Sequence, residues 1–203
     1  MHDAVLRLTE GGCDLLIAYH HASQPLQLSP ERYEMLSLGA ETIAPYARPR
    51  DDGRPMFSLD TPGREPLPLL SFAPGAYMAR MVDVILKQAG GGTALESVFE
   101  TDMAEGLKAM ALEGHGIAFL PYSAVKKELR ARRLVSAAPP EMASMQITMD
   151  VRAYREKPAG HDGLRQGARH AKPVATTGKP RGQAAKTSAQ ALWDFLLAQN
   201  PQR

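Results

Sequence analysis

The chain has 203 residues, of which 44% are hydrophobic and 23% charged, an ordinary composition for a globular protein. Its one cysteine, Cys13, excludes an internal disulfide framework and fits a reducing compartment such as the cytoplasm. No apolar run approaches the roughly 20 residues that span a bilayer. The start of the chain, MHDAVLRLTEGG, also lacks the apolar centre of a signal peptide. We therefore expect a cytoplasmic protein with no membrane partner.

The formal net charge of +2 conceals an uneven distribution. Residues 155–187 carry eight Lys/Arg and two acidic residues, so this tract is +6, while the remaining 16 basic and 20 acidic residues give −4. The tract has five glycines, three prolines and almost no large apolar residues, so we predict a disordered insertion. Weak, salt-dependent binding of polyanions is the alternative to a solvated linker, which we favour.

The first half of the chain predicts alternating helices and strands bounded by glycine and proline. We expect a helix at 3–10, followed by a buried strand at 14–19 that runs into His20 and His21. Two apolar segments at 33–38 and 42–47 lie on either side of Gly39. A turn-rich stretch at 48–66, with a short helix or strand at 56–59, then leads to a strand at 67–72. Pro45 is expected to limit strand pairing in the second apolar segment. A helix from Gly75 to about Gln88, a flexible connection at 90–92 and a strand at 94–100 follow.

Residues 102–121 form the most regular unit. Asp102 and Glu105 have the spacing of a capping box, and apolar residues recur behind them at helical intervals. Gly114 and Gly116 are expected to end the helix. Residues 116–120 are apolar on both faces, as in a strand that helices cover on both sides. Beyond them we predict a helix at 122–133, a brief strand at 134–136, an alternating strand at 147–154, and a final helix with a capping box at Thr187 and Gln190 and an apolar stripe of Leu192, Phe195 and Leu196.

Several of these segments, in this order, resemble the effector-binding domain of LysR-type transcriptional regulators. They are LRLTEGGCDLLIAYHH, PLLSFAPGAYMARMVDVIL, EGLKAMALEGHGIAFLP, ELRARRLV and ALWDFLL. The resemblance covers roughly residues 1–154 and 188–199. Within the family it is nearest to the hypochlorite-responsive branch, through AYHH and YMARMVDVIL.

This resemblance implies an α/β fold of two lobes, like a periplasmic binding protein, with the chain crossing twice between them. The first lobe would comprise 1–65, 146–154 and 188–199, the second 66–145, and the tract at 155–187 would be an insertion. One continuous sheet without a gap between halves would contradict this arrangement. The resemblance also implies a non-enzymatic domain of transcription regulation that senses a small molecule or an oxidant. It would form a homodimer through the helices at 3–10 and 75–88.

The family's effector cleft lies between the lobes, where strand ends and helix N-termini converge. The matching residues here are His20, His21, Ser71, Phe72, Gly75, Tyr77, Met78, Thr101, Asp102, Met103, Pro121 and Tyr122. Ser71 has two open interpretations, a donor to an anionic effector or a helix cap.

The chain departs from the family pattern at its beginning. Neither the DNA-binding helix-turn-helix nor the first strand of the effector domain is recognisable, so we expect contact with DNA only through a domain absent from this chain. The missing strand would leave backbone groups unpaired beside the cleft.

Oxidant sensing is suggested by ten methionines, because sulfoxide formation makes an apolar side chain polar. The candidates are Met78 and Met103, which the resemblance places across the cleft from each other, and Cys13. The alternatives are that the methionines fill gaps in the core and that Cys13 is an inert buried thiol.

No pattern in the sequence supports catalysis, a metal or a cofactor. His20 and His21 are adjacent on a strand and so point to opposite faces, which disfavours a metal pair. The three glycines at 90–92 lack the Lys-Ser/Thr of a phosphate loop. The alternative function is a solute-binding protein of the periplasmic type, which would need a signal peptide or a lipoprotein cysteine.

Overall fold

The structure is a computed structural model that describes residues 2–60, 65–90, 94–139, 141–157 and 188–199. Its elements in chain order are α1 (His2–Thr9), β1 (Leu16–His20), β2 (Tyr33–Ala47), β3 (Leu67–Phe72), α2 (Tyr77–Gln88), β4 (Leu95–Thr101), α3 (Ala104–Leu112), β5 (Ile117–Pro121), α4 (Tyr122–Arg130), β6 (Val135–Ser136), a 3-10 turn η1 (Ala143–Met145), β7 (Ile147–Glu156) and α5 (Ser188–Gln199). Most of the predicted helices and strands are found in the predicted order, and β3 matches its predicted bounds.

The two apolar segments around Gly39 form one strand, β2. Gly39 adopts φ of +140°, which L side chains rarely adopt, at a bulge in the pairing with β7. Pro45 does not limit the pairing as predicted: it pairs in register with Phe119 of β5, and its carbonyl accepts the Ala137 N–H at 2.9 Å. A proline has no N–H that needs an acceptor, and its carbonyl can still accept a hydrogen bond, so the ladder continues past it.

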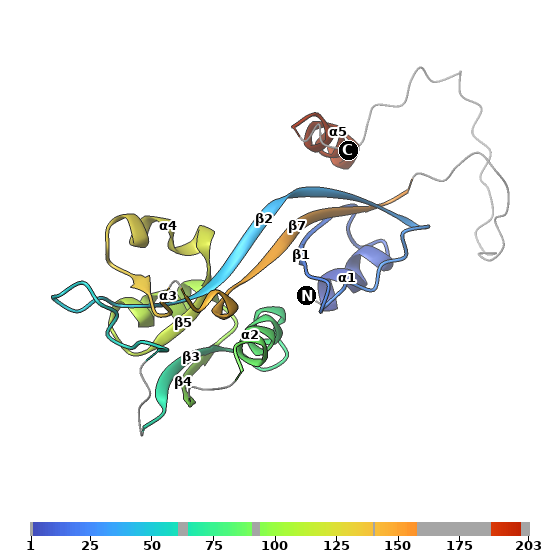
Figure 1. Cartoon of the computed structure of the whole chain (residues 1–203). Helices are drawn as coiled ribbons and strands as arrows, with labels where there is room; N and C mark the ends of the chain where they lie inside the picture. Colours follow the sequence, from blue (N-terminus) through green and yellow to red (C-terminus); the bar gives the residue numbers. More distant parts are fainter. Residues whose placement is uncertain (1, 61–64, 91–93, 140, 158–187, 200–203) are drawn as a thin grey trace, which may run out of the picture.

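The sheet has the order β1-β7-β2-β5-β3-β4, with β6 paired to the end of β2. β1, β7 and β2 are antiparallel, whereas β3, β4 and β5 are parallel. The strand pairing is therefore continuous, contrary to the expectation of a gap. The reason is the length of β2, which pairs with β7 from Tyr33 to Ile43 and with β5 from Ile43 to Tyr46. Figure 1 shows β2 and β7 as a long ribbon that joins the two ends of the molecule.

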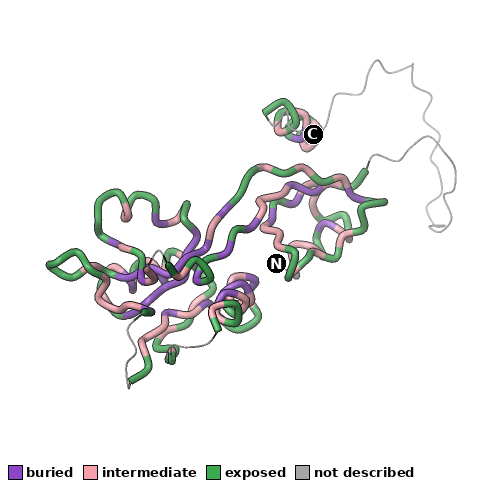
Figure 2. The backbone as a smooth tube through the Cα atoms, viewed as in Figure 1, coloured by how far each residue is buried: buried purple, intermediate pink, exposed green. Residues whose placement is uncertain are grey.

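The buried core, in contrast to the sheet, is divided. A large core lies around β3, β5, α2, α3 and α4, and it also takes in β2 from residue 43 onward. A small core lies where α1 covers the distal end of the ribbon; its buried members are Leu8, Leu16, Ala18, Tyr33 and Tyr154. Buried segments are accordingly concentrated at the base of the ribbon in Figure 2. The α/β architecture confirms the predicted fold class. The division into two halves lies in the cores and not in the sheet, so the predicted gap in the sheet is wrong, and the lobe boundaries stay a prediction.

Helix α3 does not begin with the predicted capping box. Its N-cap is Met103, and no side chain caps it. Thr101 Oγ1 instead accepts the Met103 N–H at 3.3 Å, and the Glu105 carboxylate lies 2.6 Å from Lys108 Nζ. The ion pair three residues along the helix draws the Glu105 side chain toward the C-terminus of α3.

Gly116 does not end α3 either, since Gly114 does so with φ of +83°. Gly116 lies against β3, where a Cβ would meet the Pro68 carbonyl oxygen at 2.7 Å. The glycine is required by close packing of neighbouring strands.

Three further predictions are wrong in detail. Residues 56–59 contain a bend and part of a turn, with neither helix nor strand. α4 ends at Arg130, and Arg132 has φ of +52°. In α5 the buried residue is Trp193, 2% exposed, whereas Phe195 of the predicted stripe is 59% exposed. The predicted tract at 155–187 begins inside β7, which includes Arg155 and Glu156. The rest of the tract from 158 to 187, with Thr187 of the predicted capping box, and residues 91–93 lie outside the described residues.

Candidate effector cleft

The predicted cleft residues of the second lobe meet at one edge of the sheet. Because β3, β4 and β5 are parallel, their carboxyl ends lie together. Phe72 pairs in register with Thr101, and the Ala73 N–H donates to the Thr101 carbonyl at 2.9 Å. Helices α2, α3 and α4 begin directly after these strands, so their N-termini, with exposed N–H groups, face the same edge.

The exit of β1 lies against the start of α2. Gln24, in the turn after His21, accepts a hydrogen bond from Arg80 Nε at 3.2 Å. Arg80 also donates through Nη1 to the Gly75 carbonyl at 2.7 Å and lies 5.7 Å from the centre of the Tyr77 ring. This arginine therefore joins the first lobe to the second at the predicted cleft.

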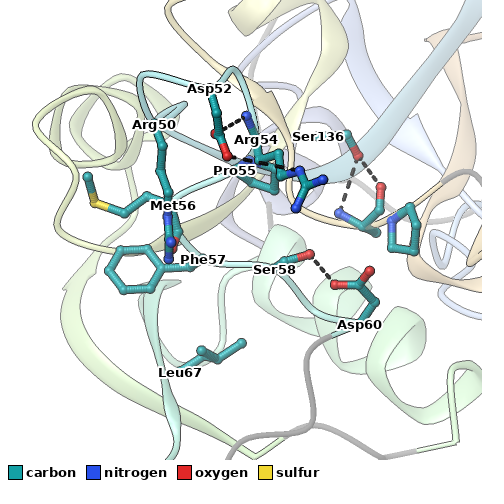
Figure 3. Close-up of a pocket in the computed structure, with 12 residues that line it drawn as sticks. Arg50, Asp52, Arg54, Pro55, Met56, Phe57, Ser58, Asp60, Leu67 and Ser136 are labelled. Atoms are coloured by element: carbon teal, nitrogen blue, oxygen red, sulfur yellow. Dashed lines mark hydrogen bonds and ion pairs between the residues drawn. The ribbon is translucent and has the colours of Figure 1, made fainter.

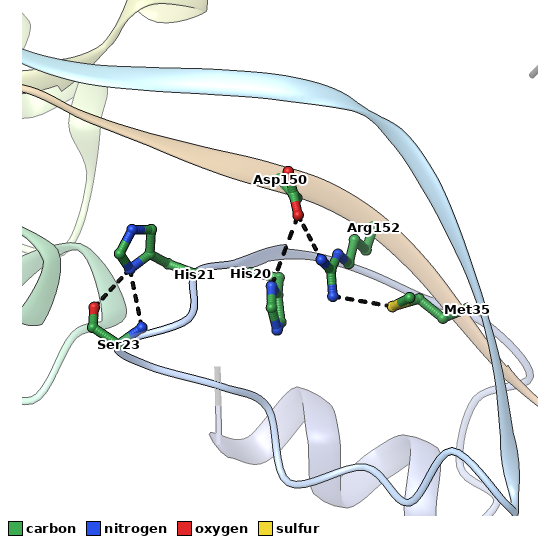
Figure 4. Close-up of polar contacts among 6 residues, drawn as sticks. All are labelled: His20, His21, Ser23, Met35, Asp150 and Arg152. Atoms are coloured by element: carbon green, nitrogen blue, oxygen red, sulfur yellow. Dashed lines mark hydrogen bonds and ion pairs between the residues drawn. The ribbon is translucent and has the colours of Figure 1, made fainter. Parts of the chain in front are cut away.

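A polar cluster lies on β7 next to β1 and β2 (Figure 4). Asp150, Arg152 and Tyr154 alternate along β7 and share one face. Arg152 donates through Nη2 to Asp150 Oδ2 at 2.5 Å and through Nη1 to Met35 Sδ at 3.2 Å. His20 pairs with Asp150 across the strands, with Nδ1 4.0 Å from Oδ2.

His20 and His21 have separate partners. His21 Nδ1 lies 2.6 Å from Ser23 Oγ, away from Asp150. The pKa of His20 is lowered by burial and by Arg152, against the smaller opposing effect of Asp150. Within the described residues no group of three or more His, Cys, Asp or Glu could hold a metal ion.

Three buried polar atoms near this cluster have no hydrogen-bond partner among the described residues: Tyr77 Oη, Tyr154 Oη and Arg152 Nε. Burial raises the pKa of both tyrosines, and the Tyr154 hydroxyl raises that of Tyr77 further, so the two hydroxyls lie near each other. Arg80 and the backbone of His21 have the smaller, opposite effect on the pKa of Tyr77. Arg152 lowers the pKa of Tyr154 but does not reach it with hydrogen-bond geometry. Buried groups of this kind are nearly always paired in proteins, so the three donors mark a place for an acceptor.

Glu41 is a buried carboxylate that the sequence analysis did not single out. It is 8% exposed, and its Oε1 accepts the Thr42 N–H at 3.0 Å and the Ser123 N–H at 3.3 Å. Ser123 lies in the first turn of α4, where a negative charge is favourable. Glu41 also raises the pKa of Tyr19 and of Tyr46, after the larger effect of burial. An acidic residue within an apolar strand was the signal that could have found it.

The family model of the LysR substrate binding domain matches residues 1–167. The chain belongs to this family. Two curated relatives are each 29% identical to it over 153 residues, or 75% of the chain: the HTH-type transcriptional regulator YjiE of Escherichia coli K12 and the HTH domain-truncated transcriptional regulator QseD of E. coli O157:H7. The match covers 47% of YjiE and 59% of QseD, so the chain spans about half the length of these relatives.

Among solved structures, the full-length hypochlorite-specific LysR-type regulator HypT of Salmonella typhimurium superposes with a TM-score of 0.72 at 24% identity. The superposition covers 99% of this chain and 56% of HypT, which shows a common fold. The family is one of transcriptional regulators, which favours the regulator over the solute-binding alternative. None of the helices in the described ranges is long and apolar enough to span a membrane.

In this LysR domain the redox candidates have different surroundings. Met103 is 63% exposed at the start of α3, whereas Met78 is partly buried against the large core. Cys13 packs at the border of the small core. Their roles, like those of the other predicted effector residues, stay predictions.

The cavities of the domain coincide only partly with the predicted cleft. Ser71 and Phe72 line a cavity of about 80 Å³ between β3 and α2. A larger one, about 750 Å³, lies between the loop after β2 and β6 and contains none of the predicted residues (Figure 3). Arg50 in its wall donates to the Met56 carbonyl at 2.8 Å, and Ser58 donates to Asp60. Sequence reasoning missed this cavity because its residues lie in a turn-rich loop.

Proposed function

We propose that this LysR domain binds an anionic small molecule or oxidant between its lobes and transmits binding as a change in lobe geometry. The observation that carries the proposal is the group of three unpartnered polar atoms, Arg152 Nε and the hydroxyls of Tyr77 and Tyr154. Two of these residues come from β7 and the third from α2. A ligand that accepts hydrogen bonds from all three would join the lobes and favour one arrangement of them.

The charge of the cleft supports an anion as the ligand. Arg152 is on the same face of β7 as Tyr154, and Arg80 lies 5.7 Å from the centre of the Tyr77 ring. Their fixed positive charges favour a negative ligand. Asp150 neutralises Arg152 only in part, because the Nε proton points elsewhere and has no partner. The anion would take the place for which these donors are already arranged.

Hypochlorite is the oxidant we propose for this chain. HypT is a hypochlorite-specific regulator. In this chain hypochlorite would act on sulfur-containing side chains, with Met78, Met103 and Cys13 as the sequence-based candidates. Hypochlorite is itself a small anion, so one site could attract it by charge before sulfur is oxidised.

The wider context follows from the family. We propose that the domain acts in the cytoplasm as a homodimer, that the helices α1 and α2 form the dimer contact, and that DNA is bound by a separate domain of the regulator. The support is membership of a family of DNA-binding regulators.

Thermal unfolding with non-oxidising anions tests the cleft. Chloride and bromide, added at constant ionic strength against fluoride, should raise Tm, since a ligand at 100 times its Kd stabilises the native state by about 2.7 kcal/mol. Arg152→Gln should remove the increase, and Arg54→Gln, in the distant loop, should retain it. Equal Tm values in all three anions for the unaltered chain would contradict the proposal.

A further inference from the structure

The structure brings together a methionine and an arginine that are far apart in the sequence. Met35 lies on β2 opposite Tyr154 of β7, and its sulfur is 3.2 Å from Arg152 Nη1. The side chain is 53% exposed, so an oxidant in solution can reach it. Met35 was not among the sequence-based redox candidates. Its contact depends on a strand register that spans 117 residues of chain.

The contact between Met35 and Arg152 is weaker than the hydrogen bond that the arginine could donate to an oxygen. A thioether sulfur is a weak hydrogen-bond acceptor, whereas a sulfoxide oxygen is a strong one. Arg152 holds a carboxylate on Nη2 and the sulfur on Nη1. An oxygen added to the sulfur would therefore be placed beside a cationic donor that is already within 3.2 Å.

We propose that Met35 is an oxidant-modification site of this domain and that Arg152 receives the sulfoxide. With hypochlorous acid, the thioether sulfur loses two electrons and gains a bond to oxygen, the Cl–O bond breaks, and chloride and a proton leave. With hydrogen peroxide the O–O bond breaks and water leaves instead. The choice of hypochlorite as the physiological oxidant rests on the proposed function, whereas the site itself needs only an accessible two-electron oxidant.

Oxidation at Met35 would be felt in the polar cluster. Asp150 shares the Arg152 guanidinium with the sulfur and lies 4.0 Å from His20. The groups that act on His20 are Arg152 and Asp150 of β7 and the neighbouring His21. A sulfoxide would draw the Arg152 guanidinium toward β2 and away from Asp150. The negative charge of Asp150 near His20 is then less neutralised, so the pKa of His20 rises. The exposed sulfur would thus alter the same cluster that contains the proposed anion site.

Three methionines in two other environments, one exposed and two buried, provide internal controls. Met103 is exposed to a similar extent, and within the described residues no guanidinium contact of its sulfur is found. Met81 and Met149 are fully buried. Exposure alone predicts that Met35 and Met103 oxidise and that the buried pair do not. Only the Arg152 contact predicts a specific effect of Met35 on His20.

The test is oxidation of the full chain by hypochlorite at one to two molar equivalents, followed by peptide mass spectrometry and NMR titration of the histidines. Met35 should oxidise at a rate within about tenfold of Met103 and faster than Met81 and Met149. The pKa of His20 should rise on oxidation in the unaltered chain and in Met103→Leu. It should stay unchanged on oxidation of Met35→Leu, whose folding is checked by circular dichroism.

Met35 remaining reduced while Met103 is fully oxidised would overturn the proposal. An equal His20 shift in oxidised Met35→Leu would overturn it as well. The halide measurement on the unaltered chain involves no oxidation. If halide does not bind but Met35 oxidises and the pKa of His20 rises, the proposed anion site is wrong and the Met35 modification site stands. If halide binds but Met35 stays reduced, the anion site stands and the Met35 site is wrong.

Discussion

The two cores of the domain differ in how many apolar residues they bury. In the large core, helices α2, α3 and α4 pack around the parallel strands, and residues such as Phe119, Leu107 and Ile117 are completely or almost completely buried. In the small core, five buried residues lie between α1 and the ribbon, and they include two tyrosines with unpartnered hydroxyls. A small core gives less stability to a lobe. The polar cluster thus lies in the part of the molecule that is easiest to rearrange.

The other face of the ribbon differs again. Helix α5 lies on the side of the ribbon opposite α1 (Figure 1) and buries Trp193, while Leu192, Phe195 and Leu197 remain exposed. A polar contact holds it: Arg155 lies 4.5 Å from the Trp193 ring centre and donates to Glu34 Oε2 at 2.6 Å and to Gln190 Oε1 at 2.8 Å. Trp193 and Arg155 therefore both contribute to the attachment of the helix.

The largest effect should come from enlarging cavities in the two cores. Leu8→Ala should cost the small core about 2–5 kcal/mol, and Phe119→Ala should cost the large core about 3–5 kcal/mol. Hydrogen exchange distinguishes the lobes: Leu8→Ala should reduce protection in α1 and β1 and leave β3 and β5 protected, whereas Phe119→Ala should reduce it throughout. Loss of protection in both lobes from Leu8→Ala would show that the cores unfold together.

A smaller effect is expected at α5. Arg155→Ala should cost about 1–2 kcal/mol, because it removes a cation–π contact and hydrogen bonds to a largely buried guanidinium. Trp193 is the only tryptophan, so its fluorescence should shift to the red as the helix detaches. Arg32→Ala, which removes a half-exposed ion pair with Glu156, is the matched control and should leave the spectrum unchanged. An unshifted spectrum in Arg155→Ala would mean that apolar packing alone holds α5.

The smallest effect is the pH dependence from His20. Its pKa is lowered in the folded state, so below the ordinary value of 6.5 the unfolded chain binds more protons at this site. The contribution of His20 to stability is therefore complete above pH 6.5 and declines as the pH falls through the window below it. Tm of the unaltered chain and of His20→Asn, measured between pH 5 and 8, should converge at low pH. A difference that is constant with pH would remove His20 from the titrating groups.

Sequence reasoning succeeded where one short segment carried the whole signal. The run at 67–72 is apolar and bounded by prolines, and it forms β3 with the expected bounds. It failed where a local signal competed with a distant partner. The predicted capping box does not form, because Glu105 pairs with Lys108. In α5, Trp193 is buried against Arg155 in place of the predicted apolar stripe. In the cleft, the parallel strand ends were predictable, because parallel strands present their carboxyl ends together.

By itself, the sequence determined the order of helices and strands, the fold class and the family, because glycine and proline positions and apolar spacing act over a few residues. Only the tertiary structure decided which polar groups meet: Met35 with Arg152, Glu34 with Arg155 and Glu41 with the start of α4. Each of these contacts joins residues 82 to 121 positions apart. The register of β2 against β7 fixes the first two contacts, and the packing of α4 against β2 fixes the third. No local sequence pattern encodes any of these contacts.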